Sequence, residues 1–81
     1  MDKAMLTQEI ERHRTTIATL RDELRLKMHL ASMDAKVAFQ ELEHKAEHLS
    51  REVSEASHRG LVEVKKRLEQ LAESLRQPTS I

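Results

Sequence analysis

The sequence contains no cysteine, tryptophan or tyrosine, and only one phenylalanine, one glycine and one proline among its 81 residues. Without cysteine the chain can form no disulfide, no thiolate metal site and no thiol nucleophile. A single glycine excludes a glycine-rich phosphate-binding loop. Because aromatic side chains are nearly absent, a compact globule of this size would lack the large groups that usually fill its centre.

The chain also has no net charge, since 14 basic side chains balance 14 acidic ones. This balance argues against a general attraction to nucleic acid or to anionic lipid. No window approaches the roughly 20 apolar residues that span a bilayer, and no apolar run near the first lysine resembles a signal peptide. We therefore expect a cytoplasmic protein without a membrane span, and we do not expect nucleic acid to be its partner.

What the sequence does contain is a long, regular apolar stripe. Apolar positions recur every eleven residues between Leu20 and Leu75, and heptad spacing precedes them from Leu6 to Leu24. An eleven-residue repeat corresponds to about 3.67 residues per turn, so the stripe runs almost straight along an α-helix. The sequence predicts an all-α protein that forms an oligomeric coiled coil or helical bundle.

The preferred interpretation is one continuous helix. Asp2 or Thr7 can cap its start, and Pro78 ends it. We therefore predict a single helical coiled-coil domain over residues 1–76, followed by a disordered tail over residues 77–81. Such a helix would be about 105 Å long. It would have no interior of its own, so its apolar face would have to be buried against another chain.

A helical hairpin is the alternative, with two places where the chain could turn. One is the stretch 31–34, where Ser32 or Asp34 could cap a new helix. The other is near Gly60, the only glycine, which follows the weak helix formers Ser54, Ser57 and His58. A turn at the first place would bring the basic stretch 12–27 close to the acidic stretch 41–55. The stripe stays in phase across both places, and a glycine within a helix costs only about 1 kcal/mol relative to alanine. These two points favour the continuous helix.

The stripe predicts self-association into a homodimer or tetramer, with a different helical protein as another possible partner. Antiparallel strands are favoured, because a centre near Gln40 would set large residues against small ones, as with Leu20 against Gly60. The predicted interface consists of Leu20, Leu24, Ala31, Ala35, Ala38, Leu42, Leu49, Val53, Val64, Leu68, Leu71 and Leu75.

Two Glu-x-x-His spacings raise the question of a metal site, at Glu41 with His44 and at Glu55 with His58. Di-iron helical bundles use this spacing because residues three apart project from one helix face. Both pairs fall off the apolar stripe, whereas a buried site needs side chains that point inward. We interpret both pairs as part of a solvated polar face.

The other histidines also have simple interpretations. His44 and His48 lie four residues apart and could chelate a surface ion, but a zinc site usually takes three or four protein ligands. His13 occupies a stripe position, where a polar residue can set the helix register. Its protonation would make assembly sensitive to pH.

No catalytic constellation is present on a single rod, which cannot gather distant side chains around a pocket. The basic cluster Lys65, Lys66 and Arg67 is interleaved with acidic residues and lacks aromatic neighbours for base stacking. We therefore interpret the chain as a non-enzymatic coiled-coil structural or protein-interaction module that self-associates, with no catalytic, cofactor-binding or metal-binding residue. The alternative is a nucleic-acid-associated or metal-binding helical bundle protein.

One segment carries a family resemblance. It runs from Leu24-Arg25-Leu26-Lys27 through Met33-Asp34-Ala35-Lys36 to Glu41-Leu42-Glu43. This sequence pattern resembles that of small uncharacterised bacterial coiled-coil proteins. It differs at Phe39, which lies near a position where such proteins would be expected to have a tryptophan. The resemblance implies a bacterial, all-helical protein and supplies no catalytic residue.

Overall fold

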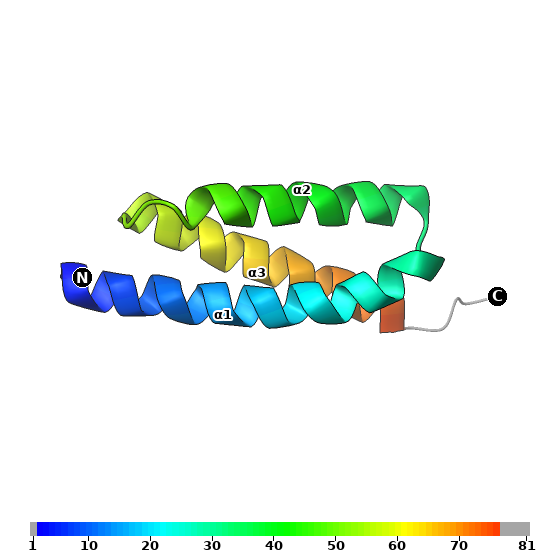
Figure 1. Ribbon diagram of the computed structural model, residues 1–81, viewed down its shortest axis with the longest axis horizontal. Helices are drawn as coiled ribbons and strands as arrows, with labels where there is room; N and C mark the ends of the chain where they lie inside the picture. Colours follow the sequence, from blue (N-terminus) through cyan, green and yellow to red (C-terminus); the bar gives the residue numbers. More distant parts are fainter. Residues whose placement is uncertain (1, 77–81) are drawn as a thin grey trace.

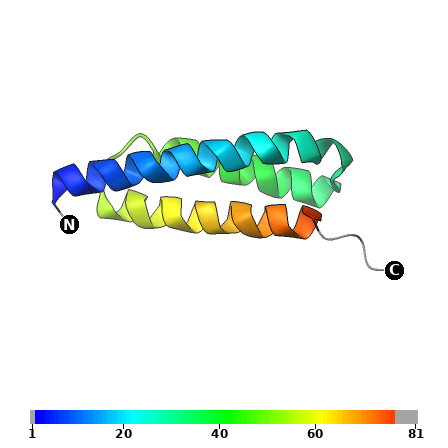
Figure 2. The same ribbon diagram turned by 90° about the horizontal axis from the view of Figure 1, so that it is seen from below.

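Within the residues that the structure describes, the chain folds into three helices connected by two turns. The computed structural model describes residues 2–76, with helices α1 (Lys3–Lys27), α2 (Met33–Leu49) and α3 (Glu55–Arg76) and a short 3₁₀ turn, η1 (Met28–Leu30), after α1. The three helices lie alongside one another, with α1 and α3 running in the same direction and α2 in the opposite one (Figures 1 and 2). The predicted all-α class is confirmed.

The preferred prediction of one continuous helix is wrong. The folded chain measures 50 × 18 × 17 Å, about half the length that a continuous helix would have. Three helices of one chain can bury their apolar stripes on each other, and short connections hold them at a high effective concentration. Packing within one chain therefore buries the apolar stripe, which the sequence interpretation expected a second chain to bury. The predicted tail, 77–81, lies outside the described residues.

The first turn lies where the hairpin alternative placed it. Ser32 caps α2, because its hydroxyl oxygen accepts a hydrogen bond from the backbone N–H of Ala35 at 3.2 Å. In the same way, the carboxylate of Asp2 caps α1 by accepting from the N–H of Met5 at 2.9 Å. Each cap satisfies one of the N–H groups that have no partner within the helix.

The second turn lies at residues 50–54 and was not predicted. The hydroxyl of Ser50 donates to the carbonyl of Ala46 at 2.7 Å where α2 ends, and Ser54 Oγ accepts from the N–H of Ser57 at 3.0 Å where α3 begins. The alternative turn near Gly60 is wrong in its position, because Gly60 lies within α3. Of the weak helix formers that precede it, only Ser54 lies in the observed turn.

The core runs along the bundle between the three helices. Helix α3 packs against both α1 and α2, whereas α1 and α2 contact each other at few places. Where they do, Nη2 of Arg25 donates to Oε2 of Glu43 at 2.9 Å, which confirms that the hairpin brings the basic stretch 12–27 to the acidic stretch 41–55. The buried apolar residues are Leu6, Ile10, Ile17, Leu24, Met28, Phe39, Ala46, Leu61, Val64, Leu68 and Ala72.

Candidate functional site

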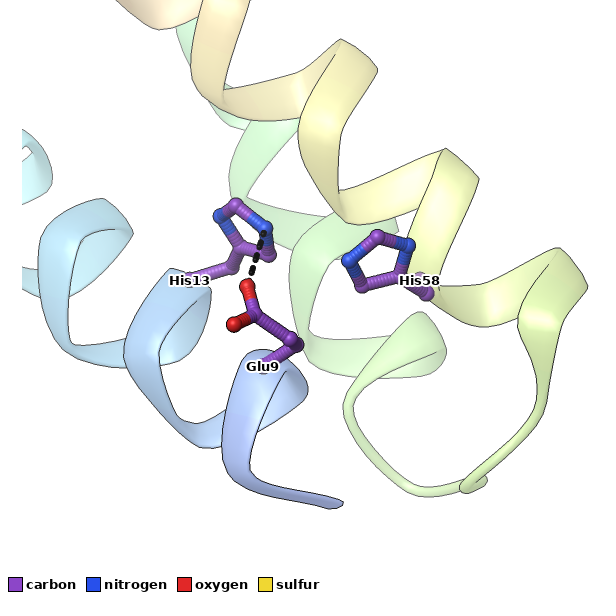
Figure 3. Close-up of side chains that lie close together, drawn as sticks. All are labelled: Glu9, His13 and His58. Carbon is purple, nitrogen blue, oxygen red and sulfur yellow. Dashed lines mark ion pairs between the residues drawn. The ribbon is translucent and has the colours of Figure 1, made fainter. Parts of the chain in front are cut away.

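Three side chains with metal-ligating atoms converge near the start of α3. They are Glu9 and His13 of α1 and His58 of α3 (Figure 3), and one ligand atom from each lies within 4.8 Å of the others. Glu9 and His13 are four residues apart and so share one face of α1. Because α1 and α3 run side by side in the same direction, that face meets the first turns of α3. We call this group the Glu–His–His cluster.

The two imidazole rings of the cluster are close but not stacked. Their centroids lie 5.1 Å apart with planes inclined at 57°. Nε2 of His13 is 3.9 Å from Oε2 of Glu9, which is too long for a direct hydrogen bond. Figure 3 shows both rings and the carboxylate facing the same small space between the helices.

His13 is the most enclosed member of the cluster, with a side chain that is 13% exposed. Burial lowers the pKa of His13 below its ordinary value of 6.5, and the positive potential of His58, Lys65 and Arg12 acts in the same direction, against an opposing effect of Glu9. Desolvation and like charge both disfavour the imidazolium form. His13 is therefore a neutral imidazole at pH 7, with a lone pair available to a ligand.

The two carboxylate oxygens of Glu9 face different neighbours. Its Oε1 accepts a hydrogen bond from Nη2 of Arg12 at 2.8 Å, while its Oε2 is the oxygen that faces His13. The arginine thus contacts one carboxylate oxygen and leaves the other facing the imidazole.

The histidine predictions have mixed outcomes. His13 was predicted at a stripe position, and its inward location is confirmed. His58 was placed on a solvated face, which is wrong, because it is partly buried and its ring lies against His13. Glu55, its predicted companion, is exposed and is not a member of the cluster. Sequence reasoning missed Glu9, although its four-residue spacing from His13 was visible.

The other predicted polar positions lie on the surface. Glu41, His44 and His48 are exposed on α2, as the solvated-face interpretation expected. In the basic cluster of α3, Lys66 and Arg67 are exposed and Lys65 is partly buried. The charge of Lys65 is close enough to His13 to lower the pKa of that residue.

The predicted interface residues line the core of this one chain. Leu24, Val64 and Leu68 are buried between the helices, and most of the others are partly buried against that core, whereas Val53 lies exposed in the second turn. Contact of these residues with another chain stays a prediction. The partly buried positions that pack on the core are Leu20, Ala31, Leu42, Leu49, Leu71 and Leu75.

A second unusual feature is a group of exposed apolar side chains at the end of the bundle where α1 joins α2. Leu26, Leu30 and Met33 are 78%, 96% and 73% exposed, and Val37 follows one turn after Met33. We call these four residues the apolar end patch. Across residues 2–76, no helix has the length and apolar character required to cross a membrane.

Comparison with protein-family models, with curated proteins and with solved structures gives no match. The resemblance to bacterial coiled-coil proteins therefore stays a prediction. Two places among the described residues have a geometry suited to binding, namely the Glu–His–His cluster and the apolar end patch.

Proposed function

We propose that this protein is a non-enzymatic helical interaction module that self-associates through the apolar end patch. The observation that carries the proposal is the concentration of exposed apolar side chains around one turn. Of the seven large apolar side chains exposed among the described residues, four belong to the patch. Single exposed apolar residues are normal on a protein surface, but a group of them at one place usually marks a contact site.

The patch does not serve the fold of the single chain. All three helices contribute side chains to the core. Leu30 of η1 is not one of the core residues and extends into solvent. Fully burying a large exposed apolar side chain gains roughly 1.5–3 kcal/mol, a range that applies to Leu30, which is 96% exposed, and less to Val37, which is 45% exposed. Four of them can therefore support association of a chain that has only a small surface.

We propose a second copy of the chain as the occupant. The net charge of zero means that two copies do not repel each other at long range. Around the patch, Lys27 lies in the last turn of α1 and Asp34 in the first turn of α2. An isologous interface pairs the same patch with itself, so each copy would bring one basic and one acidic residue to the edge of the contact.

Such a dimer differs from the antiparallel pair predicted from the sequence, which was centred near Gln40 and used residues that pack on the core of the single chain. A tetramer would require a further contact surface. A cytoplasmic location is part of this proposal, as is the absence of an enzymatic role. A different helical protein in place of the second copy is the competing occupant.

The test is sedimentation equilibrium of the purified chain and of two matched variants. Met33→Glu places a charge in the patch, and Met5→Glu places the same charge at an exposed methionine near the other end of α1. We expect the wild type and Met5→Glu to dimerise and Met33→Glu to stay monomeric with unchanged helicity. A wild type that is monomeric up to about 1 mM, where even weak specific association is detected, would contradict self-association. Equal loss of the dimer in both variants would contradict the patch as the interface.

A further inference from the structure

We propose that Glu9, His13 and His58 form a binding site for a divalent transition-metal ion of the zinc type. Two imidazoles and one carboxylate are a known ligand set for zinc, in which a water molecule completes the four-coordinate shell. The same set suits other borderline divalent ions, whose affinities differ in a regular order. The site lies far from the apolar end patch and does not depend on self-association.

The distances fit a site that closes on the ion. Bonds of about 2.0–2.2 Å from zinc to nitrogen and oxygen place tetrahedral ligand atoms roughly 3.3 Å apart. The three ligand atoms lie within 4.8 Å of one another, and the carboxylate oxygen and imidazole nitrogen of α1 are 3.9 Å apart. Shortening these distances requires side-chain rotation of Glu9 and His58, which are both partly buried and not enclosed.

The surroundings prepare the ligands. The side chain of His13 is only 13% exposed, so the packed helices hold its imidazole at the site. The guanidinium of Arg12 holds one oxygen of Glu9, so that the other is presented to the site. A group that orients a ligand in this way normally contributes to metal affinity. The positive charges of Arg12 and Lys65 oppose a cation, so they set a limit on how tightly it is held.

An ion at this position would connect two helices that are far apart in the sequence. Glu9 and His13 come from the first half of α1 and His58 from the first turn of α3. Because the unfolded chain does not hold the three ligands together, binding stabilises the folded state. The ion would pin α1 to α3 at the end of the bundle opposite the apolar end patch.

The first experiment is calorimetric titration of the full chain with Zn²⁺ at neutral pH, supported by the visible absorption of bound Co²⁺. We expect one ion per chain and a rise in melting temperature that a chelator reverses. His58→Ala and Glu9→Gln should weaken binding by more than about tenfold, the scale on which metal-site residues act. Both positions are partly exposed, so these variants should keep the fold, which circular dichroism checks.

The matched control is the double variant His44→Ala with His48→Ala, which removes two exposed histidines from α2. It should bind Zn²⁺ as the wild type does. Lys65→Gln should bind more tightly, because one opposing charge is lost. Unchanged binding in His58→Ala, or an equal loss in the α2 control, would overturn the proposed site. Failure of the wild type to bind Zn²⁺ or Co²⁺ would overturn it as well.

Discussion

The side chain of Leu49 occupies the space that a Cβ atom at Gly60 would fill. A Cβ built at position 60 would lie 2.7 Å from Cδ1 and 3.0 Å from Cδ2 of Leu49. The glycine therefore lets the end of α2 approach α3 closely. Its position in the sequence suggested a turn, but its role is to receive a large side chain from a neighbouring helix.

This contact predicts a difference between two backgrounds. Gly60→Ala alone should leave the free energy of unfolding unchanged or lower, because a helix-propensity gain of about 1 kcal/mol is offset by displacement of Leu49. In a Leu49→Ala background the same substitution should raise the free energy of unfolding by about 1 kcal/mol. Urea denaturation of the four proteins in this double-mutant cycle measures the coupling. Equal effects of Gly60→Ala in both backgrounds would show that the contact is absent.

The inward face of α2 makes a second prediction. Phe39 is buried and Val37, two residues away, is 45% exposed. Phe39→Ala should lower the free energy of unfolding by about 3–5 kcal/mol, because it removes a large side chain from the core and leaves a cavity. Val37→Ala should change it by less than about 0.5 kcal/mol when it is measured at a concentration where the chain is monomeric, so that the proposed association does not contribute.

Urea denaturation followed by far-UV circular dichroism gives both values. Phe39→Leu, a milder change, keeps the comparison measurable if Phe39→Ala does not fold. If Phe39→Ala lowered the free energy of unfolding no more than Val37→Ala does, α2 would present a different face to the core.

The third prediction concerns pH. The pKa of His13 is lowered in the folded state from 6.5, so the unfolded chain binds a proton more readily than the folded one. The contribution of His13 to the free energy of unfolding is fully present above the pKa that this residue has in the unfolded chain. It decreases as the pH falls below that value and is lost once His13 is protonated in the folded chain as well. The charges that face His13 are those of Glu9 and Arg12 on α1 and of His58 and Lys65 on α3.

The variant that tests this is His13→Gln, which keeps a polar side chain but cannot titrate. Its free energy of unfolding should fall less than that of the wild type between about pH 7.5 and about pH 5.5, a range that spans the ordinary histidine pKa. His44→Gln, at an exposed histidine on α2, should behave as the wild type. The same pH dependence in all three proteins would contradict the burial of His13.

Much of the fold follows from the periodic stripe. Leu24, Val64 and Leu68, which the sequence placed on the apolar face, are buried, and Ser32 caps a helix as one alternative expected. The number of helices did not follow, because a stripe in phase fits one rod or several helices equally well. The turn at 50–54 contains neither glycine nor proline, and Ser54 is the only one of its residues that was marked as a weak helix former.

The candidate site shows the same limit. The spacing of Glu9 and His13 could be read from the sequence, since residues four apart share a helix face. His58 joins them only because the chain turns twice and returns α3 beside α1 in the same direction. Which residues of α3 meet which residues of α1 depends on the lengths of both turns. That register is a property of the folded chain and not of any local pattern.

The arrangement of α1 beside α3 is tested most directly by an electron–electron distance within one chain. The sequence has no cysteine, so Thr15→Cys with Arg59→Cys gives two unique sites for spin labels, both at exposed positions close in sequence to His13 and His58. Labelled chains are diluted into excess unlabelled protein to remove distances between copies. The three-helix bundle predicts a separation below about 30 Å, because adjacent helices are only about 10–12 Å in diameter. A separation near 65 Å, as about 1.5 Å per residue along one continuous helix would give, would contradict the fold and the Glu–His–His cluster together.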